Sequence, residues 1–124
     1  MAKILVIDDE SGIRDLLDTL LSRKGYDVIL TDSGQKGLEV FRRARPDVVV
    51  LDLKMPGMDG LTVLQQVRSL NPTQPVIMLT GAGTPEAELQ ARALGVTEFV
   101  EKAFSLHLLG DSLKRLLDHP VTET

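Results

Sequence analysis

The chain has 124 residues, of which 43% are hydrophobic and 26% are charged, and its formal net charge is −4. This length fits one domain, and the hydrophobic content excludes a disordered chain. The acidic balance argues against nucleic-acid binding, and the lack of cysteine excludes disulfides, thiolate metal sites and thiol catalysis. The chain has no signal-peptide pattern and no apolar run of about 18 residues, so we predict a cytoplasmic protein without membrane insertion.

The first half of the chain alternates between short apolar runs and amphipathic patterns. Residues 4–7 are apolar and rich in β-branched side chains, which predicts a strand, and residues 13–21 carry apolar side chains at helical spacing. Residues 26–30 alternate between apolar and polar, as in a half-exposed strand. Ser33 is a good N-cap for a second helix, and Pro46 stops it.

The second half repeats this alternation. The apolar run at residues 48–51 is typical of a strand that is covered on both faces. The remaining predicted features, in chain order, are a type II turn at 55–58, a third helix capped by Asp59, a strand at 76–79, a fourth helix starting at Thr84-Pro85, a strand at 97–101, and a last helix from Ser105 to Leu117.

Five strand–helix repeats imply one α/β domain, a doubly wound parallel sheet with helices on both faces. We assign residues 1–118 to this domain, and residues 119–124 to a tail or the start of a linker. The sequence does not decide between a free-standing domain and a fragment of a longer regulator or hybrid kinase. In such a sheet the functional site lies at the carboxyl ends of the strands, where the strand order reverses.

Polar side chains follow four of the five predicted strands. Asp8 and Asp9 follow the first strand, Asp52 the third, Thr80 the fourth and Lys102 the fifth. In the common strand order 2-1-3-4-5 the first and third strands are neighbours, so the three aspartates should converge in one crevice.

Converging carboxylates repel each other by roughly 4 kcal/mol per pair at about 4 Å and an effective dielectric near 20. A hard cation such as Mg²⁺ relieves this repulsion and would neutralise charge on an incoming phosphoryl group. Asp52 could then act as a nucleophile and form an acyl phosphate. Lys102 offers a positive charge, and Thr80 a hydroxyl donor, to the phosphate oxygens.

Each of these residues also has an ordinary structural explanation. A single aspartate after a strand is often only a turn residue or a helix cap, and Asp59 is explained by capping alone. Glu10 is either an outer acid of the site or a solvated residue of the first helical turn. His107 and His119 have no partner at ligand spacing. The argument for a site therefore depends on the combination of residues at several strand ends.

The sequence resembles the receiver domain of two-component response regulators, which have a flavodoxin-like fold. The matching stretches are ILVIDDE at 4–10, VLDLKMPGMDG at 50–60, Leu79-Thr80, and residues 99–104 around Lys102. The resemblance covers the whole chain. It implies a domain that is not an enzyme with external turnover, and that receives a phosphoryl group from a histidine kinase or a histidine phosphotransfer protein.

By this resemblance Asp52 is the phospho-acceptor and also a ligand of Mg²⁺ or Mn²⁺. Asp9 is a direct metal ligand, Asp8 is an acid that acts largely through water, and the backbone carbonyl of Lys54 completes the protein ligands.

The resemblance also implies a switch. Thr80 is expected to move toward the bound phosphoryl group, Phe99 to turn inward with it, and Lys102 to pair with the phosphate. The fourth helix, fifth strand and fifth helix would form the output face, which contacts an output domain or partner protein and could mediate a dimer.

The chain departs from the family at two positions. Ala103 stands where proline usually follows the lysine, and a cis peptide there would cost roughly 2.5–4 kcal/mol, so we predict a trans Lys102-Ala103 bond. Gly81 stands where alanine is more usual, and it adds backbone freedom beside Thr80.

Two other functions fit parts of the pattern. Haloacid-dehalogenase-like phosphatases combine Asp, Mg²⁺, Thr and Lys, but they usually carry a second Asp two residues after the nucleophile, where this chain has Lys54. A receiver-like interaction module that never takes phosphate usually lacks the acceptor or the acid pair, which are both present here.

Overall fold

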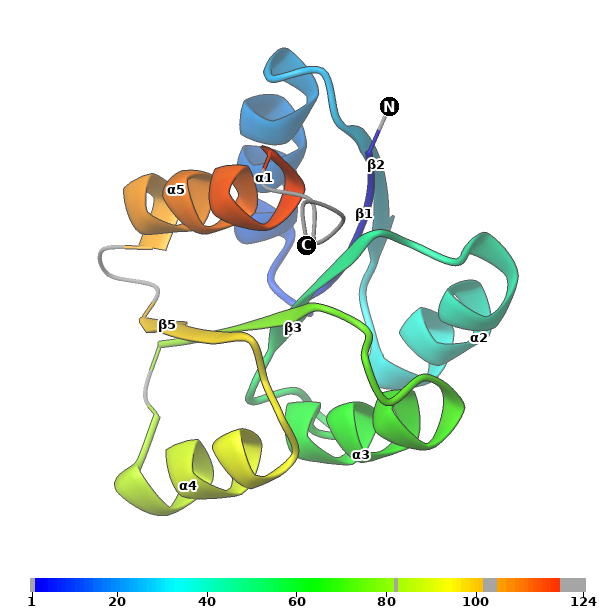
Figure 1. Cartoon of the computed structure of the whole chain (residues 1–124), viewed down its shortest axis with the longest axis vertical. Helices are drawn as coiled ribbons and strands as arrows, with labels where there is room; N and C mark the ends of the chain where they lie inside the picture. The colour runs from blue at the N-terminus through cyan, green and yellow to red at the C-terminus, as the bar shows by residue number, and fades with distance from the viewer. Residues whose placement is uncertain (1, 82, 102–104, 119–124) are drawn as a thin grey trace.

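The computed structural model describes residues 2–81, 83–101 and 105–118 of the chain (Figure 1). Strands and helices alternate strictly, as predicted. Their bounds are β1 Lys3–Ile7, α1 Ser11–Arg23, β2 Asp27–Thr31, α2 Gly34–Ala44, β3 Val48–Asp52, α3 Gly60–Leu70, β4 Val76–Thr80, α4 Pro85–Ala93, β5 Glu98–Glu101 and α5 Ser105–Asp118.

The five strands form one parallel sheet in the order β2-β1-β3-β4-β5, which confirms the predicted topology. The chain therefore reverses its winding between β1 and β3. Ile7 at the end of β1 lies beside Leu51, and Asp52 at the end of β3 lies beside Leu79. This register brings the loops after β1, β3 and β4 to the same edge of the sheet.

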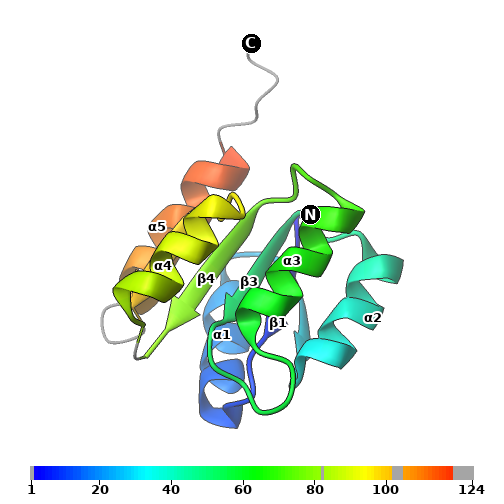
Figure 2. The ribbon, with the colours of Figure 1, turned by 90° about the horizontal axis from the view of Figure 1, so that it is seen from below.

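The sheet separates two hydrophobic cores. Helices α2, α3 and α4 lie side by side over one face, and α1 and α5 cover the other (Figures 1 and 2). Because side chains alternate along a strand, neighbours such as Ile4 and Leu5 belong to opposite cores. The strands β3 and β4 are buried along their whole length, as their continuous apolar runs predicted.

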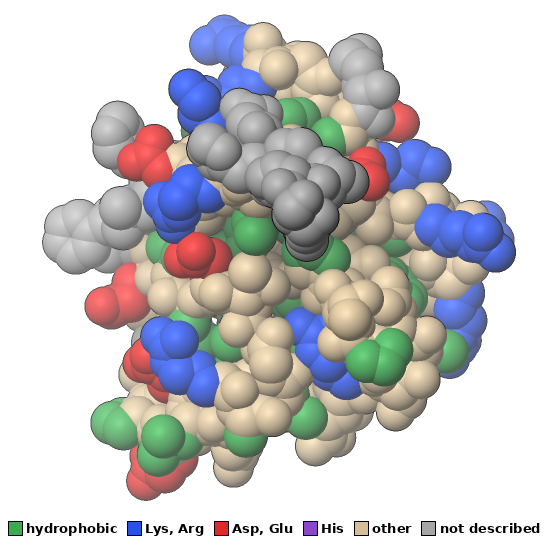
Figure 3. All heavy atoms as spheres, viewed as in Figure 1, with side chains coloured by type: hydrophobic (Ala, Val, Ile, Leu, Met, Phe, Trp, Pro, Cys, Tyr) green, Lys and Arg blue, Asp and Glu red, His purple; other side chains and the backbone are tan. Residues whose placement is uncertain are grey.

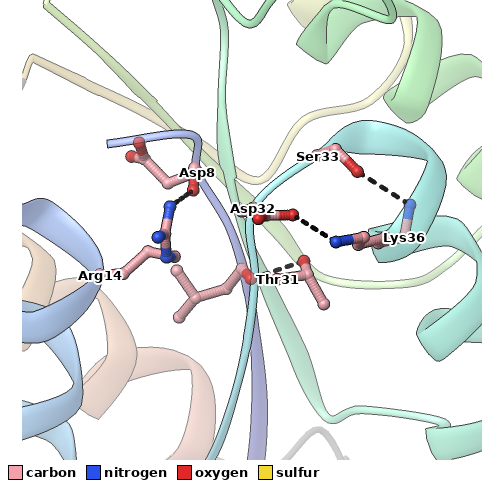
Figure 4. Close-up of polar contacts among 7 residues, drawn as sticks. Asp8, Arg14, Thr31, Asp32, Ser33 and Lys36 are labelled. Carbon is pink, nitrogen blue, oxygen red and sulfur yellow. Dashed lines mark hydrogen bonds and ion pairs between the residues drawn. The ribbon is translucent and has the colours of Figure 1, made fainter. Parts of the chain in front are cut away.

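Side-chain caps begin three of the helices. Ser33, Asp59 and Thr84 each accept a hydrogen bond from the backbone amide three residues later, at 3.2, 2.9 and 3.1 Å. The sequence predicted all three as N-caps, and the first of them is drawn in Figure 4. It also predicted Ser105 as a cap, whereas Ser105 is the first residue of α5 itself. Gly57 has φ +77°, the left-handed conformation that the third position of a type II turn requires.

Basic side chains gather over α2 on the face drawn in Figure 3. The last turn of this helix carries Arg42 and Arg43, both exposed, where positive charge is favourable to the helix dipole.

Among the described residues, no helix combines the length and the apolar character needed to cross a membrane.

Arg68 near the end of α3 ties three parts of the fold together. Its guanidinium donates to the carbonyl oxygens of Leu94 at 2.6 Å, Gln74 at 2.7 Å and Gly95 at 2.7 Å. Burial lowers the pKa of Arg68 from its ordinary value, because the charged form loses part of its hydration. The three carbonyls compensate for that loss, so α3 is joined to the β4 entry and to the turn between α4 and β5.

We expect Arg68→Met to lower the free energy of unfolding by about 2 kcal/mol, because three carbonyls lose a charged donor. Urea denaturation followed by circular dichroism measures this change. Arg92→Met is the matched control, since Arg92 is exposed and pairs with Glu88 one turn away on the same helix. Its loss should change stability by no more than about 0.5 kcal/mol. Equal effects of the two substitutions would contradict a structural role for the Arg68 contacts.

Candidate functional site

Three polar residues are buried at the ends of β1, β3 and β4, at the carboxyl edge of the sheet. Asp52 and Thr80 are the last residues of β3 and β4, and Asp8 directly follows β1. Their relative exposures are 3%, 1% and 1%, although each carries a polar side chain. A buried carboxylate is costly unless other groups compensate its charge, so this edge is the part of the fold where chemistry is most expected.

Carboxylates from two strand ends meet in one acidic group. Asp8, Glu10 and Asp52 each place a side-chain oxygen within 4.8 Å of the other two. At that separation and an effective dielectric near 20, the Asp8–Asp52 pair alone repels by roughly 3 kcal/mol. The three oxygens are hard donors, close enough to share one small divalent cation, so the group fits Mg²⁺ or Mn²⁺.

The loop after β1 decides which acids join this group. The amide of Glu10 donates to Asp8 Oδ1 at 2.9 Å, so the loop turns around the buried carboxylate. This turn brings Glu10, the N-cap residue of α1, beside Asp8 and leaves Asp9 exposed and outside the group. The role of Asp9 as a direct ligand stays a prediction, and so does the Lys54 carbonyl, whose residue is exposed in the loop after β3.

A glycine holds the loop after β3 against the end of that strand. The Gly60 amide donates to the Leu53 carbonyl at 2.8 Å, and the Leu53 amide donates to the Leu79 carbonyl at 3.0 Å. A Cβ atom on Gly60 would overlap the Asp52 carbonyl oxygen and would come within 2.8 Å of Leu53 Cα. Only a glycine allows this close approach, which fixes the main chain that carries Asp52.

Thr80 and Phe99 lie on the same side of the sheet. Phe99 is half-buried and packs against the core under α2, α3 and α4, and alternation along β4 places Thr80 on that side too. A Cβ atom on Gly83 would come 3.0 Å from Thr80 Cγ2 and 3.3 Å from two carbons of the Phe99 ring. The threonine and the aromatic ring of the predicted switch are therefore neighbours.

Lys102 and the peptide bond to Ala103 lie outside the described residues, so their predicted roles stay predictions.

The structure also draws attention to Arg14, which the sequence analysis did not single out. Its guanidinium donates to the Asp8 carbonyl at 2.8 Å. The sequence pattern gave no signal for this contact, because it depends on how the loop after β1 folds back toward α1.

Comparison with known proteins agrees with this geometry. The family model described as response regulator receiver domain matches residues 4–114. The chain is 33% identical to sporulation initiation phosphotransferase F of Bacillus subtilis over 115 residues, which are 93% of each chain. It is 45% identical to the probable transcriptional regulator ycf27 of Porphyridium aerugineum over 103 residues, but these are only 42% of that regulator's length.

Solved structures give the same result. Chemotaxis protein CheY4 of Vibrio cholerae is 34% identical with a TM-score of 0.87, and the match covers 94% of this chain and 99% of that chain. Response regulator protein TrrA of Thermotoga maritima, in complex with Mg²⁺ and BeF, is 35% identical with a TM-score of 0.86, over 94% and 100% of the two chains.

The fold and the acidic group at its carboxyl edge define a receiver-type signalling domain. The chain belongs to the response regulator receiver domain family, and it is a receiver domain of a two-component system.

We expect Gly60→Ala to destabilise the domain by about 2 kcal/mol, because the added methyl group forces the Asp52 main chain to move. Thermal unfolding followed by circular dichroism measures this cost. Gly12→Ala on α1 is the matched control, since a Cβ there meets nothing within 4 Å. That substitution should be neutral or stabilising by up to about 1 kcal/mol. A Gly60→Ala protein as stable as the wild type would show that the loop has room for a methyl group.

Proposed function

We propose that Asp52 accepts a phosphoryl group from a phosphohistidine of a histidine kinase or a histidine phosphotransfer protein, in a reaction that requires Mg²⁺. One observation carries the proposal. Asp52 is buried at the end of β3 with one oxygen within 4.8 Å of oxygens from Asp8 and Glu10. A divalent cation bound to this group would offset the repulsion between the carboxylates and would attract the oxygens of a phosphoryl group.

In the transfer step a carboxylate oxygen of Asp52 forms a bond to phosphorus. The bond between phosphorus and the donor histidine breaks, and the imidazole leaves with the electron pair. Bound Mg²⁺ supplies positive charge against the phosphoryl oxygens and the carboxylates. Asp8 and Asp52, with Glu10 or Asp9, would hold it. The nearly complete burial of Asp52 restricts water around the product.

The remaining residues respond to the product in this proposal. Thr80 donates its hydroxyl to a phosphoryl oxygen, and Lys102 pairs with the phosphate. Phe99 turns inward as Thr80 moves, which changes the face formed by α4, β5 and α5. Thr80 and the Phe99 ring both lie close to Gly83, and this proximity supports the coupling. The domain acts as a cytoplasmic switch for an output domain or partner protein, and its own chemistry is limited to accepting and losing the phosphoryl group.

Intact-mass measurement after incubation with acetyl phosphate and Mg²⁺ tests the proposal. We expect the mass of one phosphoryl group on the wild type, and none after Asp52→Asn or after removal of Mg²⁺ with a chelator. Asp59→Asn is the matched control, because Asp59 ends the loop that follows Asp52 but caps α3. This control should still be labelled. A wild type that binds Mg²⁺ but gains no mass at saturating donor would instead identify an interaction module.

A second experiment decides which acid completes the cation site. We expect Asp9→Asn to weaken Mg²⁺ binding about tenfold or more, because its exposed carboxylate turns inward when the cation binds. Glu10→Gln should weaken binding less than about threefold. Isothermal titration calorimetry with MgCl₂ measures both constants. The reverse order would show that Glu10, which already lies in the acidic group, is the ligand in place of Asp9.

A further inference from the structure

Arg14 connects the first helix to the buried acid of the site. It lies in the first turns of α1 and reaches back six residues, so that Nη1 donates to the Asp8 carbonyl at 2.8 Å (Figure 4). Arg14 is half-buried, and it lines a surface pocket together with Thr31 and Asp32 at the end of β2. A charged donor in a partly dehydrated place makes one of the stronger hydrogen bonds in proteins.

The other contacts of Asp8 show what this bond adds. The Asp8 amide donates to the Thr31 carbonyl at 3.1 Å, which fixes one side of its main chain to β2. The Glu10 amide donates to Asp8 Oδ1 at 2.9 Å, which fixes one carboxylate oxygen. The bond from Arg14 fixes the carbonyl, beyond the last residue of β1, so the rotation of the peptide after Asp8 is set by a side chain of α1.

We propose that Arg14 is a positioning residue for the acidic pocket. It holds the main chain of Asp8 so that the Asp8 carboxylate faces Asp52. This inference rests on the proposed function, since it concerns Mg²⁺ binding at the same pocket. It adds a residue that does not touch the cation or the phosphoryl group.

Two roles for Arg14 predict opposite changes in Mg²⁺ affinity. If Arg14 acted only as a nearby positive charge, its removal would lower the repulsion of the cation and tighten Mg²⁺ binding. If it positions Asp8, its removal lets the peptide rotate and weakens Mg²⁺ binding. The sign of the change therefore separates the two roles without any measurement of phosphorylation.

The experiment compares Mg²⁺ binding by calorimetry in four proteins: wild type, Arg14→Met, Arg14→Lys and Arg43→Met. We expect Arg14→Met to weaken binding about tenfold, the scale for losing a group that orients a metal ligand. Arg14→Lys keeps a donor and should recover part of the affinity. Arg43 lines the same surface pocket of about 470 Å³ but bonds within its own helix, so Arg43→Met reports the loss of charge alone.

A double substitution tests whether the effect passes through Asp8. In an Asp8→Asn background, adding Arg14→Met should change the Mg²⁺ affinity by less than about twofold, because interacting residues are not additive. Thermal unfolding without Mg²⁺ must show that each variant is folded. Unchanged or tighter binding in a folded Arg14→Met protein would overturn the inference. A wild type that does not bind Mg²⁺ would instead overturn the proposed function.

Discussion

The repulsion between carboxylates at the ends of β1 and β3 is the constraint on which the site depends. The parallel sheet fixes the positions of these acids. Its register sets Ile7 beside Leu51, so the next residue after each of them lies at the same edge of the sheet. Asp8 and Asp52 are both almost fully buried there. Two hydrophobic cores, one on each face of the sheet, provide the stability that offsets this unfavourable arrangement.

Three of the contacts around the acids involve the main chain. Gly60 fits against the carbonyl of Asp52, the guanidinium of Arg14 bonds to the carbonyl of Asp8, and the amide of Glu10 bonds to the Asp8 carboxylate. Such contacts fix the peptides that carry the acids. Two of these residues, Gly60 and Arg14, orient the acids although they contribute no carboxylate to the group.

Much of this arrangement can be predicted from the sequence. The features that cannot be predicted, which concern Asp9 and Arg14, depend on the conformation of one loop. Periodicity predicts the strands and helices, and N-cap chemistry places the starts of three helices at Ser33, Asp59 and Thr84. The exposed position of Asp9 follows from the turn of a short loop, and a pattern of residue types does not specify that rotation. The bond from Arg14 spans six residues between a loop and a helix, a distance at which no sequence periodicity applies.

The separation of the two cores by the sheet has a mechanical consequence. Alternation places Asp52 on the side of α1 and α5, whereas Thr80 lies on the side of α2, α3 and α4. These two residues are the last of adjacent strands. A group bound to both residues would link the α1 and α5 layer directly to the α2, α3 and α4 layer at the edge of the sheet. In the absence of such a group, these two layers are joined through the strands between them. Its arrival or departure would stiffen or loosen both layers together, although it touches only the rim of the molecule.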